Sequence, residues 1–241
     1  MFPPLFYDGD TYVNIEGVIF DFNGVLLWDT ALHETAWQQF ASKILGRPLT
    51  EPEIQEHIHG RNNRHTLEFI LGRSLDNNEV SRYTKVKELI YQNLAIAEKE
   101  NYQLSPGAIS LLTYLKNHQI PYTIATASPE LNLDFYFKTL GLSEWFDRDL
   151  IIYDDGSRPG KPDPAFFLAA AAKIGVSFGQ CALIEDSISG LKAAYFGCAG
   201  EIIALGEPSK HDHLKQNLGV THVISQLDEL IPLLEIETAP Q

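Results

Sequence analysis

Five side chains in this sequence combine into chemistry that none of them performs alone. They lie at or between the ends of short apolar runs and are Asp21, Thr126, Lys161, Glu185 and Asp186. A carboxylate can attack phosphorus, a hydroxyl and an ammonium can hold phosphate oxygens, and two further carboxylates can bind a hard cation such as Mg²⁺. Ligands of open α/β sheets bind beyond the carboxyl ends of the strands, so the set predicts a Mg²⁺-dependent phosphoryl-transfer site.

Each of these residues also has an ordinary structural explanation. Asp21 can be a turn or helix-cap residue, and Asn23-Gly24 can form a hairpin turn. Thr126 is β-branched and suits a strand, and the acidic pair at 185–186 can cap the following helix. Their occurrence in order, each beside the end of an apolar run, favours one shared site over several unrelated structural roles.

The elements that must position these residues follow a regular alternation. Continuous apolar runs predict strands buried on both faces, at 17–22, 122–126, 150–153, 182–185 and 202–205. The stretches between them predict helices at 108–117, 131–140, 165–174, 189–196 and 211–218. Gly141, Gly175 and Gly197 stand where helix C-terminal stops are expected. This rhythm predicts an α/β fold with a doubly wound, Rossmann-like parallel-sheet core.

One long stretch breaks the alternation. No strand-like run occurs between Thr30 and Leu104, where helical patterns cover 32–45, 51–59, 66–71 and 79–101. The segment Ser105-Pro106-Gly107 ends this stretch, and the β/α alternation then resumes. We therefore predict an all-helical cap domain over residues 30–104, inserted into an α/β core domain formed by residues 1–29 and 105–241.

Composition narrows the possible partners. The formal net charge of −14 repels nucleic acid and anionic membrane surfaces, so an anionic substrate needs a local positive group such as a bound divalent cation. Residues 1–16 lack the basic start and apolar stretch of a signal peptide, and no apolar run approaches the roughly 18 residues of a membrane span. Cys181 and Cys198 have no paired spacing and are predicted to be free thiols. We expect a cytoplasmic protein, monomeric or weakly dimeric, with no nucleic-acid or membrane partner.

Taken in order, the motifs resemble those of the haloacid dehalogenase superfamily, which consists mostly of phosphatases and phosphomutases. The resemblance covers about residues 17–225 and includes the helical insertion, which is similar to the cap of the β-phosphoglucomutase-like branch. The segment from His33 to Trp37 resembles the start of that cap's first helix. His59-Gly60, followed by Arg61 and Arg64, resembles its substrate-specificity loop.

The resemblance implies a role for each residue of the site. Asp21 is the nucleophile and forms an aspartyl-phosphate, while Thr126 and Lys161 bind the transferring phosphoryl oxygens. Mg²⁺ is held by the Asp21 carboxylate, the backbone carbonyl of Asn23, and Glu185 and Asp186. The implied substrate is a small phosphorylated metabolite such as a sugar phosphate. The implied substrate-binding residues are Gly24, Thr126, Ala127, Lys161, His33, Gly60, Arg61 and Arg64.

Asn23 departs from the family pattern, which has a second Asp there as general acid and base. An amide can neither give nor take a proton at ordinary pH, and losing a general acid–base lowers rates by roughly 10²–10⁴. We hypothesise that Asp29 or His33 partly replaces the missing acid. Alternatively, Asp29 caps the first cap helix and His33 hydrogen-bonds the hinge. The sequence leaves open whether the chain is a phosphatase, a phosphomutase or a non-catalytic phospho-metabolite-binding protein.

Overall fold

The computed structural model describes residues 14–98 and 101–237, which contain one parallel sheet of six strands in the order β3-β2-β1-β4-β5-β6. The strands are β1 Gly17–Phe20, β2 Tyr122–Pro129, β3 Ile152–Asp154, β4 Cys181–Glu185, β5 Glu201–Leu205 and β6 His222–Ile224. Ile19 pairs with Thr123 of β2 on one side and with Leu183 of β4 on the other. The strand order therefore reverses direction at β1, which places a ligand crevice beyond the ends of β1 and β4.

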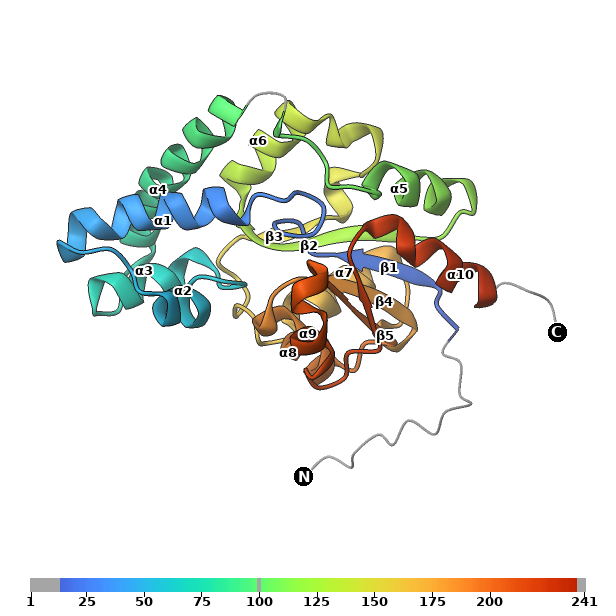
Figure 1. Cartoon of the computed structure of the whole chain (residues 1–241). Coiled ribbons are helices and arrows are strands. Elements are labelled where there is room, and N and C mark those ends of the chain that lie inside the picture. The colour runs from blue at the N-terminus through green and yellow to red at the C-terminus, as the bar shows by residue number, and fades with distance from the viewer. Residues whose placement is uncertain (1–13, 99–100, 238–241) are drawn as a thin grey trace.

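Helices cover both faces of the sheet (Figure 1). One face carries α5 Ala108–Asn117, α6 Glu130–Leu140 and α10 Ile231–Glu237, and the other carries α7 Ala165–Ile174, α8 Ile188–Gly197 and α9 His211–Lys215. Phe20 packs into the apolar cluster of the first face and Ile19 into that of the second. Both faces of β1 are thus buried, which explains its uninterrupted apolar run. Short 3₁₀ turns join these elements at Leu142–Glu144, Arg148–Leu150, Phe178–Gln180, Pro208–Lys210 and Leu227–Leu230.

Four helices between β1 and α5 form a group beside the sheet, coloured blue to green in Figure 1. They are α1 Thr30–Leu45, α2 Glu51–His57, α3 Asn63–Leu71 and α4 Asn77–Glu98. Their buried faces share an apolar cluster of their own, centred on Phe40, Leu67 and Ile70. The predicted doubly wound core with a helical cap is confirmed. Part of the predicted helix 79–101 lies outside the described residues, as do residues 1–13 of the predicted core.

The positions predicted for Gly197 and Leu150 need correction, and one strand was not predicted. Helix α8 runs through Gly197, and Cys198 instead adopts the left-handed conformation, with φ 60°. Gly197 serves close packing, because a Cβ there would lie 2.6 Å from the Phe178 ring. Leu150 belongs to a 3₁₀ turn rather than to β3. Strand β6 was not predicted because it spans three residues without an apolar run.

Two predictions from composition concern features that the structure describes directly. Cys181 is buried in β4, Cys198 is exposed, and both are free thiols as predicted. Among the helices of the described residues, none is both long enough and apolar enough to cross a membrane.

Candidate active site

The carboxyl ends of β1 and β4 bring three acidic residues together. Asp21 directly follows β1 and is 6% exposed, Glu185 ends β4 and is fully buried, and Asp186 comes next. Oxygen atoms of the three carboxylates lie within 4.8 Å of one another. Asp21 and Asp186 line a cavity of about 1310 Å³, whose walls come from both the core and the cap. The predicted acidic cluster therefore exists and faces a space that can hold a ligand.

Lys161 supplies the cation of this cluster. Its Nζ lies 3.0 Å from Asp21 Oδ1 and 2.5 Å from Glu185 Oε1, and its side chain is 1% exposed. Burial acts to lower the pKa of Lys161, but the two neighbouring carboxylates outweigh it and raise that pKa above its usual value. Glu185 is fixed from its other side, because Oε2 accepts hydrogen bonds from the backbone and hydroxyl of Ser187 at 2.7 and 3.0 Å.

Negative charge exceeds positive charge in the cluster, with three carboxylates against one ammonium. Burial, only partly offset by Lys161, raises the pKa of Asp21 to about 7. Burial and the charges of Glu185 and Asp21 raise the pKa of Asp186 well above its usual range. A donor set of buried carboxylate oxygens with unbalanced negative charge fits a hard divalent cation.

Gly24 allows the loop after β1 to approach this cluster. A Cβ at this position would lie 2.0 Å from Asp186 Oδ2, and the backbone has φ +82°. Both the space and the conformation therefore require glycine.

The end of β2 contributes the polar wall of the cavity. Thr126, Ala127 and Ser128 all line it, and Thr126 Oγ1 accepts a hydrogen bond from the Ser128 backbone at 3.1 Å. Ser128 was not among the residues predicted for the site. Its only sequence signal is its position as a third small residue at the same strand end.

The cap reaches the cavity through two segments. His33 on α1 and the loop residues Gly60 and Arg61 line it. Arg61 donates to the backbone oxygen of Lys161 at 2.9 Å, and a Cβ on Gly60 would lie 2.4 Å from Ser187 Oγ. The specificity-loop segment is therefore packed directly against the core cluster.

Arg64 is placed differently from the other predicted substrate-binding residues. Its guanidinium donates to the backbone oxygen of Leu75 at 2.7 Å and to Asn77 Oδ1 at 2.6 Å, and it does not line the cavity. Because α3 turns this face toward the start of α4, Arg64 joins two parts of the cap to each other.

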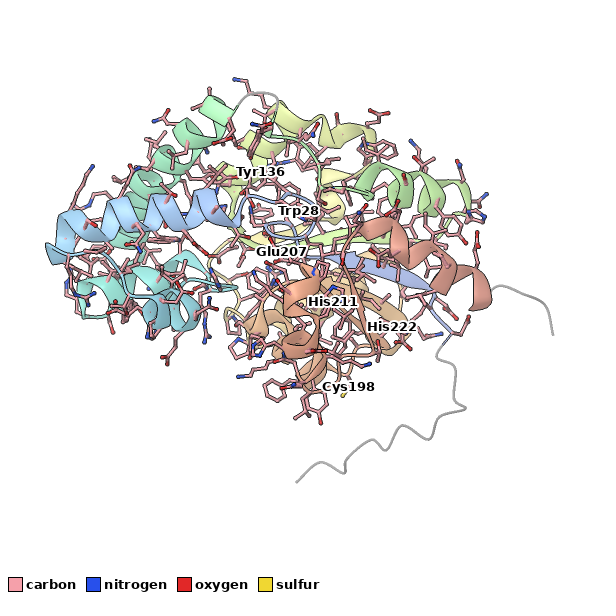
Figure 2. The ribbon with its side chains drawn as sticks, viewed as in Figure 1. Trp28, Tyr136, Cys198, Glu207, His211 and His222 are labelled. Carbon is pink, nitrogen blue, oxygen red and sulfur yellow. The ribbon has the colours of Figure 1, made fainter. Side chains whose placement is uncertain are left out.

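Trp28, in the linker that precedes α1, also lines the cavity and is 55% exposed. Glu207, which follows β5, borders the same cavity, and both residues are labelled in Figure 2. The cavity lining thus includes an aromatic side chain from the linker and a carboxylate from beyond the end of the sheet.

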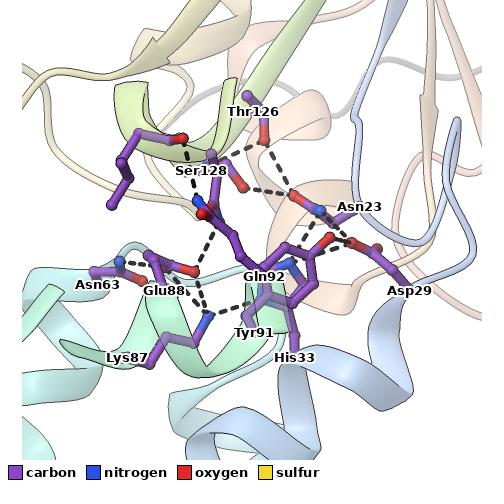
Figure 3. A network of polar contacts seen from close by, with 12 residues as sticks. Asn23, Asp29, His33, Asn63, Lys87, Glu88, Tyr91, Gln92, Thr126 and Ser128 are labelled. Carbon is purple, nitrogen blue, oxygen red and sulfur yellow. Dashed lines mark hydrogen bonds and ion pairs between the residues drawn. The ribbon is translucent and has the colours of Figure 1, made fainter. Parts of the chain in front are cut away.

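Behind His33, polar side chains form a network that connects the cap to the core (Figure 3). Asp29 holds the N-cap position of α1, yet its side chain makes no capping bond and instead accepts from Asn23 Nδ2 at 2.8 Å. Lys87 donates to His33 Nδ1 at 2.7 Å and pairs with Glu88 at 3.1 Å. Lys87 and Glu88 are each 1% exposed. This buried pair was not predicted, because charged residues on an amphipathic helix normally face water.

Comparisons with known proteins agree with this geometry. A family model for haloacid dehalogenase-like hydrolases matches residues 15–194. A phosphorylated carbohydrates phosphatase of Thermotoga maritima is 30% identical over 75% of this chain and 80% of its own length. A beta-phosphoglucomutase of Bacillus subtilis is 30% identical over 90% of this chain and 92% of its own. The crystal structure of a family IA hydrolase from Entamoeba histolytica superposes with a TM-score of 0.80 at 35% identity, covering 93% of this chain and all of that one.

The chain therefore belongs to the haloacid dehalogenase-like hydrolases. The resemblance noted in the motifs is confirmed, and so is the prediction of an enzyme of this family with a β-phosphoglucomutase-like helical cap.

Proposed function

We propose that this protein is a Mg²⁺-dependent phosphatase or phosphomutase-like enzyme acting on a small phosphorylated metabolite such as a sugar phosphate. The observation that carries the proposal is the pairing of Lys161 with Asp21 and Glu185 at the wall of the cavity. The named activities of two relatives, a phosphorylated carbohydrates phosphatase and a beta-phosphoglucomutase, support a phosphorylated sugar as substrate. An apolar cluster formed by cap residues alone supports division into a cap domain, 30–104, and a core domain, 1–29 with 105–241, and Ala36, Tyr91 and Ala95 of the cap pack into the cluster of the core.

The proposed reaction has two displacement steps at phosphorus. An oxygen of Asp21 bonds to phosphorus while the ester P–O bond breaks, and the bonding electrons stay on the leaving oxygen, which takes its proton from solvent water because the Asn23 amide has none to give. Water, or a second sugar hydroxyl in a mutase, then bonds to phosphorus and releases the Asp21 carboxylate. Lys161 and Thr126 hold the phosphoryl oxygens, and Ser128 extends that wall. Gly24, Ala127, His33, Gly60 and Arg61 line the space left for the rest of the substrate.

In this proposal, the metal is held by the carboxylates of Asp21, Glu185 and Asp186 and by the backbone carbonyl of Asn23. When bound, it neutralises charge on the transferring phosphoryl group. The excess of carboxylates over ammonium in the cluster supports a divalent cation. A cytoplasmic location and a monomeric or weakly dimeric state remain predictions from the sequence.

Asn23 favours a second candidate function, binding of a phosphorylated metabolite without turnover. Its amide has no proton to give to a leaving oxygen. For a weakened enzyme, substrates whose leaving group needs no protonation should be preferred, such as acyl, aryl or anomeric sugar phosphates. Of the two residues considered as replacements for the acid, His33 lines the cavity and Asp29 does not.

A phosphate-release panel with and without Mg²⁺ separates these functions. Asp21→Asn should lower turnover by at least about 10⁴-fold, because the attacking oxygen is lost. Asp149→Asn is the matched control, since Asp149 is exposed and lies outside the cavity. Wild-type turnover of zero on every compound, with Mg²⁺ and phosphate still bound, would establish the binder.

Two further comparisons belong to the same panel. Equal rates on alkyl and aryl phosphates would reject the leaving-group preference. Turnover and a pH profile unchanged by His33→Ala would remove His33 as a replacement acid.

A further inference from the structure

Asn23 is the centre of a hydrogen-bond network that joins three separate segments of the chain. Its Nδ2 lies 2.8 Å from Asp29 Oδ2, 2.9 Å from Tyr136 Oη and 3.1 Å from His33 Nε2. Its Oδ1 accepts from Ser128 Oγ at 2.7 Å. These partners come from the linker before the cap, the first cap helix α1, and the core elements β2 and α6. One side chain therefore contacts the first cap helix and bonds to the linker and to the core, and the linker residue Asp29 also accepts a hydrogen bond from Tyr91 of the cap helix α4 (Figure 3).

The hydrogens in this network can be assigned from its neighbours. Lys87 has only donors, so His33 Nδ1 accepts from it and Nε2 of the neutral ring carries the hydrogen. That hydrogen is directed at Asp29 Oδ2, 3.3 Å away. The two amide hydrogens of Asn23 then go to Asp29 and Tyr136.

A ring of bonds completes the assignment. Tyr136 donates to Ser128 Oγ at 3.3 Å, and Ser128 donates back to Asn23 Oδ1. Rotating the amide by 180° would set its oxygen against the Asp29 carboxylate. The orientation of Asn23 is therefore determined by its partners.

No carboxylate can replace this amide without loss. With Asp at position 23, two oxygen atoms lacking hydrogens would face each other across 2.8 Å. Asp29 is 1% exposed, so bulk solvent does not reach the contact. Buried polar atoms without partners, and like charges at this distance, are both strongly unfavourable.

We propose that Asn23 and Asp29 form a polar latch, one amide and one carboxylate. Because Asp29 stands at the N-cap of α1 and also accepts a hydrogen bond from Tyr91 of α4, the latch fixes the first linker and, through it, holds the cap over the cavity. This inference goes beyond the proposed function and does not depend on turnover. The latch requires one amide and one carboxylate, not a particular order of the two. An Asp at position 23 is therefore tolerated only when position 29 becomes an amide.

A double-mutant cycle in the full chain tests the latch. Asn23→Asp should lower the Tm by about 6 °C or more, because hydrogen bonds are lost and two carboxylates meet. Asp29→Asn should have a smaller effect, and the exchange Asn23→Asp with Asp29→Asn should recover at least half of the loss. Asn93→Asp, on an exposed position of α4, is the control and should leave the Tm unchanged. If the change in Tm of the double variant equals the sum of the changes in the two single variants, the two residues do not interact and the latch is wrong.

Amide hydrogen exchange supplies a second measurement. Asn23→Asp should speed amide hydrogen exchange over residues 26–33, where the linker meets α1. The double variant, Asn23→Asp with Asp29→Asn, should restore protection there. If Asn23→Asp does not fold, recovery of soluble protein in the double variant supports the latch. Failure of the double variant to give soluble protein overturns the proposal. This outcome can be distinguished from failure of the proposed function. If no variant, wild type included, turns over any phosphate ester, the proposed catalytic activity is wrong, but the Tm values of the double-mutant cycle still test the latch. Higher turnover in Asn23→Asp at unchanged Tm would reject the latch and keep the enzyme.

Discussion

Two buried groups of charged side chains border the cavity, and they are balanced in different ways. The core cluster, comprising Asp21, Lys161, Glu185 and Asp186, has three carboxylates for one ammonium. The cap pair, Lys87 and Glu88, has one charge of each sign. Glu88 also accepts from Asn63 at 2.6 Å and from Asn132 at 2.7 Å.

The difference shows in the acidic pKa values. The carboxyls of Asp21 and Asp186 have raised pKa values, because burial is not fully offset. Burial also acts to raise the pKa of Glu88, but Lys87, His33 and the two amides outweigh it and lower that pKa. The cap pair is complete without a ligand, whereas the core cluster needs positive charge from outside the protein. Buried charge therefore marks a binding site only where its balance is incomplete.

The largest expected effect on turnover comes from removing positive charge from the core cluster. Lys161→Met removes the ammonium that pairs with Asp21 and Glu185, so phosphate release should fall by about 10²–10³-fold. Lys173→Met is the control, because Lys173 is exposed and donates only to the backbone oxygen of Asp149. Steady-state kinetics would contradict the assignment if both variants stayed within about threefold of wild type.

Breaking the balanced pair should affect stability more than activity. Glu88→Gln leaves Lys87 without its carboxylate and should lower the free energy of unfolding by about 3–5 kcal/mol in urea. In contrast, Glu79→Gln breaks an exposed pair with Arg73 and should leave the urea midpoint within error. A loss no larger than that of the exposed pair would show that the cap pair contributes nothing to folding.

The Glu88 contribution should also depend on pH. Its folded pKa lies below the ordinary 4.5, so the stabilisation is present above that value and disappears as the pH falls through the folded pKa. The difference between wild type and Glu88→Gln should therefore shrink in acid. A difference that stays constant down to pH 2 would contradict the ionised state of Glu88.

The smallest effect concerns how the cap loop meets the core cluster. Gly60 and Gly72 both have φ +66°, so alanine at either should cost about 1–2 kcal/mol of backbone strain. Only at Gly60 would the new Cβ meet Ser187 Oγ, at 2.4 Å, while nothing lies within 4 Å at Gly72. Gly60→Ala should therefore raise KM several-fold and Gly72→Ala should not. Equal KM values for the two variants would show that the loop around Gly60 does not take part in substrate binding.

The apolar pattern of the sequence was sufficient to predict the layered architecture. Continuous runs such as 182–185 arise only where both faces of a strand are buried, so a parallel sheet with helices on each side follows from them. The long helical stretch between β1 and α5 predicted the cap for a similar local reason. Short or exposed elements such as β6 carry too weak a pattern to be predicted.

The order of apolar and polar residues in the chain was enough to place Asp21, Thr126, Glu185 and Asp186 at strand ends, because each of them ends or follows an apolar run. It also showed that position 23 is an amide. The contacts of that amide depended on the tertiary structure, since Ser128 and Tyr136 approach it from segments more than 100 residues away, and the fold of the linker brings Asp29 and His33 beside it. The tertiary structure likewise directed Arg64 away from the cavity and buried Lys87 with Glu88. Periodicity reports which face of an element is apolar, whereas the partner of a buried polar group depends on how distant elements pack.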